Sequence, residues 1–276
     1  MKLKYYLVGL PLIGLLAASC GNRNEVPADS EISEFEIHKK LLTADRSYRV
    51  VTDYGTVYLE MYTSVQWPEK FGGNDIKVLQ DSVLNFAYSD TTSVSIHDAI
   101  RKYLDDTSFL EGVKEIVPVD TLPSDSMTYF SSVTGSVLDL DEGMVTYQLV
   151  SSSYLGGAHP MTATHPFTYD FAESRVLDNS NIFRPGTPTD SIVPVIREAL
   201  ARQLGVPVSR LKNEGVFADQ LTYPGIPYIS GNTLYFPYDP YEIGPYAMGS
   251  VDVAVYPYEI ERFLQPSVVR LFDQGF

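Results

Sequence analysis

Residues 127–152 read M-T-Y-F-S-S-V-T-G-S-V-L-D-L-D-E-G-M-V-T-Y-Q-L-V-S-S. Two runs of alternating apolar and polar residues, 127–138 and 143–152, are joined by Asp-Leu-Asp-Glu-Gly. Two such runs on either side of a turn that contains Asp, Glu and Gly are typical of a β-hairpin. This stretch therefore predicts a pair of antiparallel strands at the start of the second half of the chain.

Strand patterns of the same kind recur on both sides of this hairpin. Before it, the runs 49–51 and 56–62 predict a first hairpin, which Pro68 and Gly72-Gly73 are expected to end. After it, aromatic and β-branched runs predict strands at 165–171, 233–238 and 250–256.

Apolar residues at helical spacing predict helices that are set apart from these strands. They are expected at 74–88 with Asn74 as N-cap, at 95–105 with a Ser95–Asp98 capping box, at 190–204 ended by Gly205, and at 259–264. Runs of strands with helices set apart favour an α+β fold. We expect antiparallel sheets with helices packed on one face.

Composition divides the chain into four parts. Residues 1–19 are expected to be a signal peptide and 20–45 a polar tether whose end can pair as a first strand. A Pro-, Ser- and Asp-rich stretch, 118–126, separates the rest into 46–122 and 123–276. We expect these two parts to be small, closely associated α+β domains.

The first twenty residues carry an export signal. Lys2 and Lys4 precede an apolar segment, 5–18, which is too short to span a membrane but suits a signal peptide. Small residues stand immediately before Cys20, the one cysteine of the chain, as in a bacterial lipobox. We expect lipidation of Cys20 and a lipid-anchored protein of the cell envelope, in the periplasm or at the outer membrane or cell surface.

The charge of the chain limits its partners. The formal net charge is −15, and cleavage after residue 19 would remove only Lys2 and Lys4 among charged residues, giving −17. Nucleic acids are excluded as partners because phosphate contacts need Lys and Arg. The same charge favours a basic protein, although it also serves solubility.

The stretch Y-L-G-G-A-H-P, residues 154–160, raises two interpretations for His159. Imidazole titrates near neutral pH, so His159 is a candidate ligand or general base on a glycine loop. The alternative is a structural corner, since Gly156 and Gly157 supply unusual backbone angles. The spacing of His159 and His165 matches no closed zinc motif, and HExxH, G-x-S-x-G and a phosphate loop are absent. We expect no metal, no cofactor and no identifiable catalytic residue.

Tyrosines gather near the C-terminus. Eight of the twenty tyrosines lie between Tyr223 and Tyr258, interleaved with prolines. Tyrosine presents a flat apolar face and a hydroxyl, which suits a glycan or a protein interface, while Tyr-Pro pairs also stiffen loops. With His159, the candidate ligand-binding residues are Tyr154, Tyr241, Glu242 and Tyr246.

An ordered series of motifs in the second half resembles a known family. It runs from G-G-A-H-P at 156–160 through F-T-Y-D at 167–170 and T-L-Y-F-P-Y-D-P-Y-E-I-G-P-Y-A-M-G at 233–249 to V-Y-P-Y at 255–258. Residues 127–276 resemble the C-terminal extracytoplasmic domain of unknown function of RsiV-type anti-sigma factors. The first half, with Gln66-Trp67-Pro68, more faintly resembles the domain that precedes it in RsiV and in PdaC.

This resemblance implies an α+β extracytoplasmic module that recognises a partner, which in RsiV is lysozyme. The sequence therefore favours a non-enzymatic envelope lipoprotein that binds a protein, such as a lysozyme-like basic protein, or a cell-envelope polymer. One alternative is a glycan or peptidoglycan hydrolase that uses Glu242, Asp239 or His159 as acid or base. Another is a structural envelope component, which predicts no cleft and no exposed aromatic patch.

Overall fold

The computed structural model describes residues 37–93, 95–124, 126–141 and 143–272. The predicted signal peptide, Cys20 and most of the tether lie outside them. The described residues belong to one compact unit, Phe35–Phe276. Residues 37–45, the end of the predicted tether, pair as part of a first strand.

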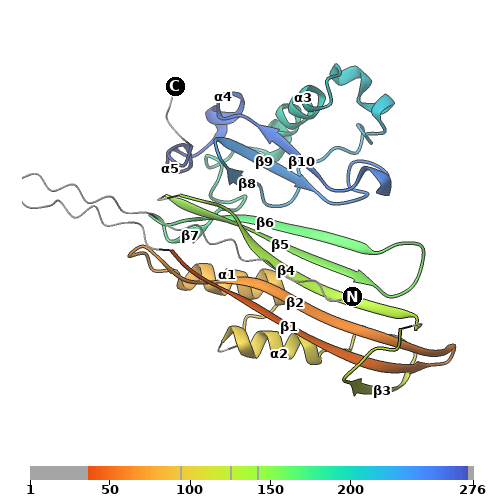
Figure 1. Ribbon diagram of the computed structural model, residues 1–276. Helices are drawn as coiled ribbons and strands as arrows, with labels where there is room; N and C mark the ends of the chain where they lie inside the picture. Colours follow the sequence, from red (N-terminus) through yellow and green to blue (C-terminus); the bar gives the residue numbers. More distant parts are fainter. Residues whose placement is uncertain (1–36, 94, 125, 142, 273–276) are drawn as a thin grey trace, which may run out of the picture. The chain divides into compact units, whose positions relative to one another are not determined.

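A seven-stranded sheet has the order β3-β1-β2-β4-β5-β6-β7 (Figure 1). Its strands are β1 (Ile37–Thr52), β2 (Gly55–Phe71), β3 (Val113–Val119), β4 (Thr128–Leu140), β5 (Met144–Tyr154), β6 (Met161–Asp170) and β7 (Arg175–Val176). Neighbours are antiparallel except β2 and β4, which are parallel because the chain crosses over between them through two helices and β3. The sheet takes strands from both sides of residue 122.

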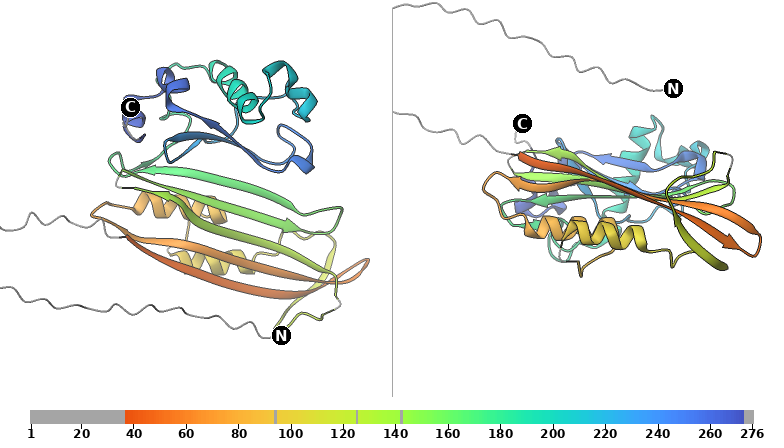
Figure 2. Two further views of the ribbon diagram at one scale, coloured as in Figure 1. Left: turned by 45° about the horizontal axis from the view of Figure 1, so that its top comes forward. Right: turned by 60° about the horizontal axis from the view of Figure 1, so that its bottom comes forward.

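The crossover helices α1 (Lys77–Tyr88) and α2 (Ile96–Asp105) lie on the same face of this sheet (Figure 2). Each packs an apolar stripe on it. Helix α2 and the strands β1 and β2 bury one cluster that includes Val50, Leu59 and Ile100. Helix α1 packs over β4, β5 and β6 around Tyr147 and Phe167. The helices therefore cover the sheet from one side, as the sequence predicts.

A three-stranded antiparallel sheet, β10-β9-β8, forms a second layer. It comprises β8 (Tyr228–Ser230), β9 (Thr233–Tyr238) and β10 (Val251–Val255), and α3 (Val193–Gln203) packs on it. Short helices α4 (Pro257–Ile260) and α5 (Pro266–Val269) and the 3-10 turns η1 (Thr189–Ser191), η2 (Val208–Glu214), η3 (Tyr246–Met248) and η4 (Glu261–Phe263) complete this part.

Buried threonines join the two sheets. Thr146 of β5 and Thr168 of β6 lie side by side, fully buried, and their hydroxyls are 2.8 Å apart. The Thr168 hydroxyl accepts from Ile229 N at 2.8 Å, and the Thr146 hydroxyl donates to Ile229 O at 2.5 Å. Neighbouring Val145 and Tyr147 pack on the α1 side, so β5 is buried on both faces. The small sheet thus rests on the face opposite to the helices.

The α+β prediction is confirmed, with local corrections. Asn74 does not cap α1; its side-chain amide donates to Phe71 O at 3.1 Å, and the Asp75 carboxylate accepts from Lys77 N at 2.9 Å. Ser95 does cap α2, accepting from Asp98 N at 3.2 Å. Pro68 does not end β2, because it lies beside a bulge of its own strand, where the missing N–H is tolerated. Lys39 pairs with Pro68 and His38 with Lys70, so the register skips Glu69.

Further boundaries differ from the prediction, among them those of the last helix and of the loop at 118–126. The last predicted helix begins earlier, at Pro257, and continues as the 3-10 turn η4. Strand β3 extends to Val119, so the expected loop at 118–126 begins within an edge strand.

Candidate functional site

The two motif segments singled out in the sequence meet in the structure. The Y-L-G-G-A-H-P stretch joins β5 to β6, and residues 239–250 join β9 to β10. The imidazole of His159 stacks on the Tyr246 ring at a centroid distance of 3.7 Å, and its Nε2 lies 3.0 Å from the Tyr241 hydroxyl. We call His159, Tyr241 and Tyr246 the His159 cluster.

Glycines give the β5–β6 turn its shape. Gly156 and Gly157 have φ values of +93° and +107°, which other residues rarely adopt. A Cβ on Gly156 would also lie only 3.3 Å from the Tyr129 hydroxyl. The Tyr154 hydroxyl donates to Gly157 O at 3.0 Å across the turn. Tyr154 therefore braces the turn and, unlike the other three aromatic candidates, does not join the His159 cluster.

Carboxylates fix the β9–β10 loop. The Glu242 carboxylate accepts from Asp239 N at 2.7 Å, and Glu242 N donates to Asp239 O at 3.1 Å, which closes a tight turn. Within that turn, Tyr241 has a φ of +76°, an unusual value for a residue with a side chain. The turn holds the Tyr241 ring at the surface, where it is 51% exposed.

The same loop protects an edge of the large sheet. Beyond its short pairing with β7, strand β6 has no further strand on its outer side among the described residues. There the Asp239 carboxylate accepts from Thr164 N at 2.9 Å, and Pro166 has no N–H to satisfy. Asp239 thus ties the β9–β10 loop to β6 and blocks pairing with another chain.

Hydrogen bonds define the state of His159. Its Nδ1 lies 3.0 Å from Pro160 O, and a carbonyl oxygen can only accept, so Nδ1 carries a proton. In the neutral ring Nε2 then accepts from the Tyr241 hydroxyl. The Tyr246 hydroxyl also donates to Pro160 O, at 3.0 Å. Both nitrogens of His159 are therefore hydrogen-bonded, which holds the ring in one orientation at the surface.

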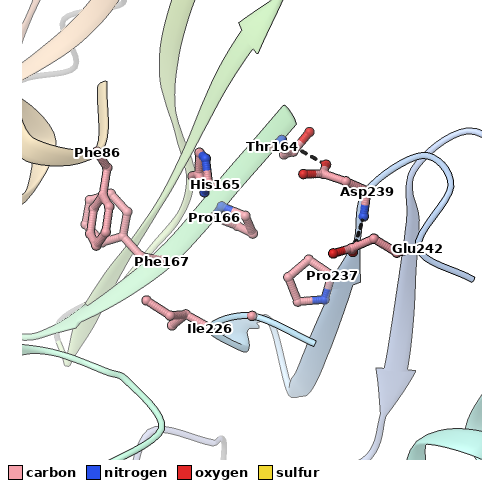
Figure 3. A pocket seen from close by; sticks show the side chains of 10 residues that line it. Phe86, Thr164, His165, Pro166, Phe167, Ile226, Pro237, Asp239 and Glu242 are labelled. Carbon is pink, nitrogen blue, oxygen red and sulfur yellow. Dashed lines mark hydrogen bonds between the residues drawn. The ribbon is translucent and has the colours of Figure 1, made fainter. Parts of the chain in front are cut away.

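A small cavity of about 160 Å³ adjoins this loop (Figure 3). Phe86 of α1, Pro166 and Phe167 of β6, Ile226 and Pro237 supply apolar walls, while Thr164, His165, Asp239 and Glu242 line the polar side. The dashed bonds in Figure 3 run from Thr164 to Asp239 and from Asp239 to Glu242, along one side of the cavity. Glu242 therefore belongs to this cavity, next in sequence to Tyr241.

Buried tyrosines support the loop from behind. Burial, with a smaller contribution from the charge of Glu242, raises the pKa of Tyr238 well above its usual range. Its hydroxyl donates to Thr222 O at 2.7 Å. Burial likewise raises the pKa of Tyr223, whose hydroxyl donates to Asn179 Oδ1 at 2.7 Å. Both remain neutral donors, so part of the tyrosine-rich region is structural.

The described residues contain no group of three or more His, Cys, Asp or Glu side chains that could hold a metal ion. None of their helices is both long and apolar enough to cross a membrane.

Sequence reasoning named His159, Tyr241, Glu242 and Tyr246 one by one, and the structure brings them to one loop pair. It missed Thr164 and Ile226, which line the cavity. No local pattern points to them, because the cavity forms only when β6 and the β8–β9 region meet.

Part of this site lies in a segment that matches the model of a described family. Residues 180–258 match DUF3298, described as a protein of unknown function; this range contains Tyr241, Glu242 and Tyr246 but not His159. The crystal structure of a DUF3298 family member from Bacteroides fragilis is similar with a TM-score of 0.67 and 15% identity, covering 86% of this chain and 97% of that one. A DUF3298 family protein from Pseudomonas aeruginosa gives a TM-score of 0.56 and 16% identity, covering 84% and 96%.

A curated relative matches over a shorter range. A Mycobacterium tuberculosis protein named as an esterase is 43% identical over 63 residues, which is 22% of this chain and 28% of the relative. The match therefore spans little more than a quarter of the relative's length. At these identities the solved structures establish the fold alone.

Proposed function

We propose that this protein is a non-enzymatic binding module of the bacterial cell envelope, which recognises a basic protein through the His159 cluster and the adjoining carboxylates. The observation that carries the proposal is the convergence of two sequence motifs on one surface. His159 and Tyr241 are 82 positions apart, yet their side chains are 3.0 Å apart.

Aromatic rings beside carboxylates suit a cationic partner. The Tyr241 ring is half exposed, with its centroid 5.6 Å from that of Tyr246, so the two form a platform. A guanidinium or ammonium group binds favourably over such a ring. Asp239 and Glu242 each use one carboxylate oxygen on a backbone N–H, which leaves the other for a partner. The net charge of −15 would steer a basic protein toward the molecule.

The envelope location and the partner class rest on the sequence. The lipobox-like segment before Cys20 supports a lipid anchor, and the resemblance of residues 127–276 to the RsiV domain supports a lysozyme-like partner. A cell-envelope polymer is the second ligand class, because tyrosine faces also stack on sugars.

A hydrolase is the second candidate function, favoured by the partial match to the protein named as an esterase. His159 is a candidate base for such an enzyme, because its Nδ1 is held by Pro160 O and its Nε2 accepts from a hydroxyl, that of Tyr241. Asp239 and Glu242 remain further candidates as acid or base.

Binding of the soluble chain, residues 21–276, to lysozyme and to peptidoglycan fragments tests the proposal. This chain contains the whole compact unit, Phe35–Phe276. Calorimetry at low and moderate salt should show salt-sensitive lysozyme binding. Tyr241→Ala should weaken it about tenfold or more, as expected of a central aromatic residue. Tyr258→Ala is the matched control, since Tyr258 is 67% exposed outside the site.

Three outcomes would count against the proposal. Binding to neither ligand by the folded protein would remove the recognition function. Equal losses of lysozyme affinity for Tyr241→Ala and Tyr258→Ala would show that the interface does not lie at the His159 cluster. Hydrolysis of a short-chain nitrophenyl ester that is abolished by Glu242→Gln would favour the enzyme instead.

A further inference from the structure

The large sheet extends far beyond the helices that cover it. Strands β1 and β2 have 16 and 17 residues, whereas α2 has 10. At about 3.3 Å per strand residue the strands span roughly 50–55 Å, and at 1.5 Å per helical residue α2 spans only about 15 Å. Past the end of α2 at Asp105, part of the apolar face of the sheet is left to loops.

A groove of about 700 Å³ occupies this uncovered region. The β1–β2 hairpin, the segment after α2, the start of β4 and the β5–β6 turn line it. Its lining includes Val50, Thr52, Phe109, Glu111, Met127 and Leu155. Val50 is 1% exposed and belongs to the α2 cluster, so the floor of the groove continues the hydrophobic core.

Exposed apolar side chains gather around this groove. Met127 is 64% exposed, and Phe109, Leu155 and Tyr54 are also exposed. Single exposed apolar residues are ordinary, but their concentration around one concave region is typical of a ligand site. The volume lies in the range of small-molecule pockets, about 300–1,000 Å³.

Few polar groups in the groove are available to a ligand. Thr52 is engaged by the hairpin turn, donating to Gly55 O and accepting from Tyr54 N. Nearby charges are paired, Asp53 with Lys114 and Arg49 with Glu115. Glu111 is the charged residue among the described lining residues, and it is exposed. An apolar ligand body is therefore favoured, with an anionic head disfavoured beside Glu111.

We propose that this groove binds the alkyl chain of an amphiphile with a cationic head group, the chain lying against Val50, Met127 and Leu155 and the head beside Glu111. The charge of Glu111 and the net charge of −15 select against anionic amphiphiles. This site is separate from the His159 cluster and does not depend on its function. The two share only the β5–β6 turn, which supplies Leu155 to one and His159 to the other.

Fluorescence of N-phenyl-1-naphthylamine, a neutral apolar probe, reports occupancy of the groove in the soluble chain, residues 21–276. Dodecyltrimethylammonium should displace the probe below its micellar concentration, and dodecyl sulfate should do so at least about tenfold less well. Met127→Asp should weaken probe binding about tenfold, because the bound apolar probe would remove water from the new carboxylate at a cost in free energy. Leu41→Asp is the matched control, since Leu41 is 63% exposed and Met127 64%.

Glu111→Gln should leave probe binding unchanged. It should reduce the difference in affinity between dodecyltrimethylammonium and dodecyl sulfate. The proposal is overturned if the folded wild-type protein binds neither probe nor cationic amphiphile, or if Met127→Asp and Leu41→Asp weaken binding equally. A dimer in sedimentation that Met127→Asp dissociates, without probe binding, would assign the groove to a second copy of the chain instead. Equal displacement by both amphiphiles would refute the role of Glu111.

Discussion

The positive φ of Tyr241 leads to a stability test that separates backbone strain from side-chain contacts. Tyr241 is one of three residues other than glycine with positive φ among the described residues, and its ring is half exposed. Tyr241→Ala and Tyr241→Gly both remove the ring and its hydrogen bond to His159. The two variants differ in backbone strain, because glycine adopts a φ of +76° without cost, and in the backbone entropy lost on folding.

Two opposing terms set the expected difference. A left-handed conformation costs an alanine about 1–2 kcal/mol. Glycine loses more backbone entropy on folding, by about 0.5–1 kcal/mol. The Gly variant should therefore be more stable than the Ala variant by about 0.5–1 kcal/mol. For a domain of this size that is a difference of about 1–4 °C in Tm.

Tyr246 provides the control, because it contacts the same imidazole but lies in the 3-10 turn η3 and lacks a positive φ. There the order should reverse, with Tyr246→Gly less stable than Tyr246→Ala by about 0.5–1 kcal/mol. Urea and thermal unfolding of the four variants measure both differences. A Gly variant that is less stable than the Ala variant at both positions would refute the strain argument.

Two carboxylates, the partly buried Asp252 and the fully buried Asp170, give further predictions. Burial raises the pKa of Asp252, so the folded protein holds this proton more tightly than the unfolded chain. Ionised Asp252 therefore destabilises the folded state. This destabilisation is absent at pH values below the ordinary carboxyl pKa of the unfolded chain and complete at pH values above the raised pKa of the folded protein. Asp252→Asn, which can still accept from Tyr228, should therefore raise Tm at pH 7 and change it less at pH 3; equal changes at both would contradict this. Asp170, fully buried, accepts from Arg270 and from Ala172 N at 3.0 Å. Arg270→Ala should lower the free energy of unfolding by about 2–3 kcal/mol, the lower end for a broken buried pair because Arg270 is 34% exposed. This would be refuted if, in urea unfolding, the double variant Asp170→Asn/Arg270→Ala lost more free energy of unfolding than Arg270→Ala alone.

Local signals predicted the elements that local chemistry determines. The strand at 233–238 has the predicted bounds, and the Ser95 cap forms because its hydroxyl meets a donor three residues on. Long-range packing determined what the sequence did not reveal. The parallel pairing of β2 with β4 needs a crossover of more than fifty residues. Met144–Tyr147 are four consecutive buried residues. A continuous buried run of this kind does not predict that a different layer covers each face of the strand.

The candidate site illustrates the same division. Each residue of the His159 cluster stands out locally, through glycines, prolines or tyrosines, and was named from the sequence. Their contact depends on the Asp239 bond to Thr164 N, between residues 75 positions apart, which only the docking of the β9–β10 loop on β6 creates. Tyr154 carries the same local signal but turns back to its own loop.

The carboxylates of the site hold the β9–β10 loop in place. Here Thr164 N donates to Asp239, and Asp239 N donates to Glu242, so the two carboxylates follow one another along a single strand end. This series fixes the turn that holds Tyr241 at positive φ, and Tyr241 in turn meets His159. Because each carboxylate positions the next group in the chain of contacts, Tyr241 and His159 are held in one arrangement, which is what the proposed binding surface requires.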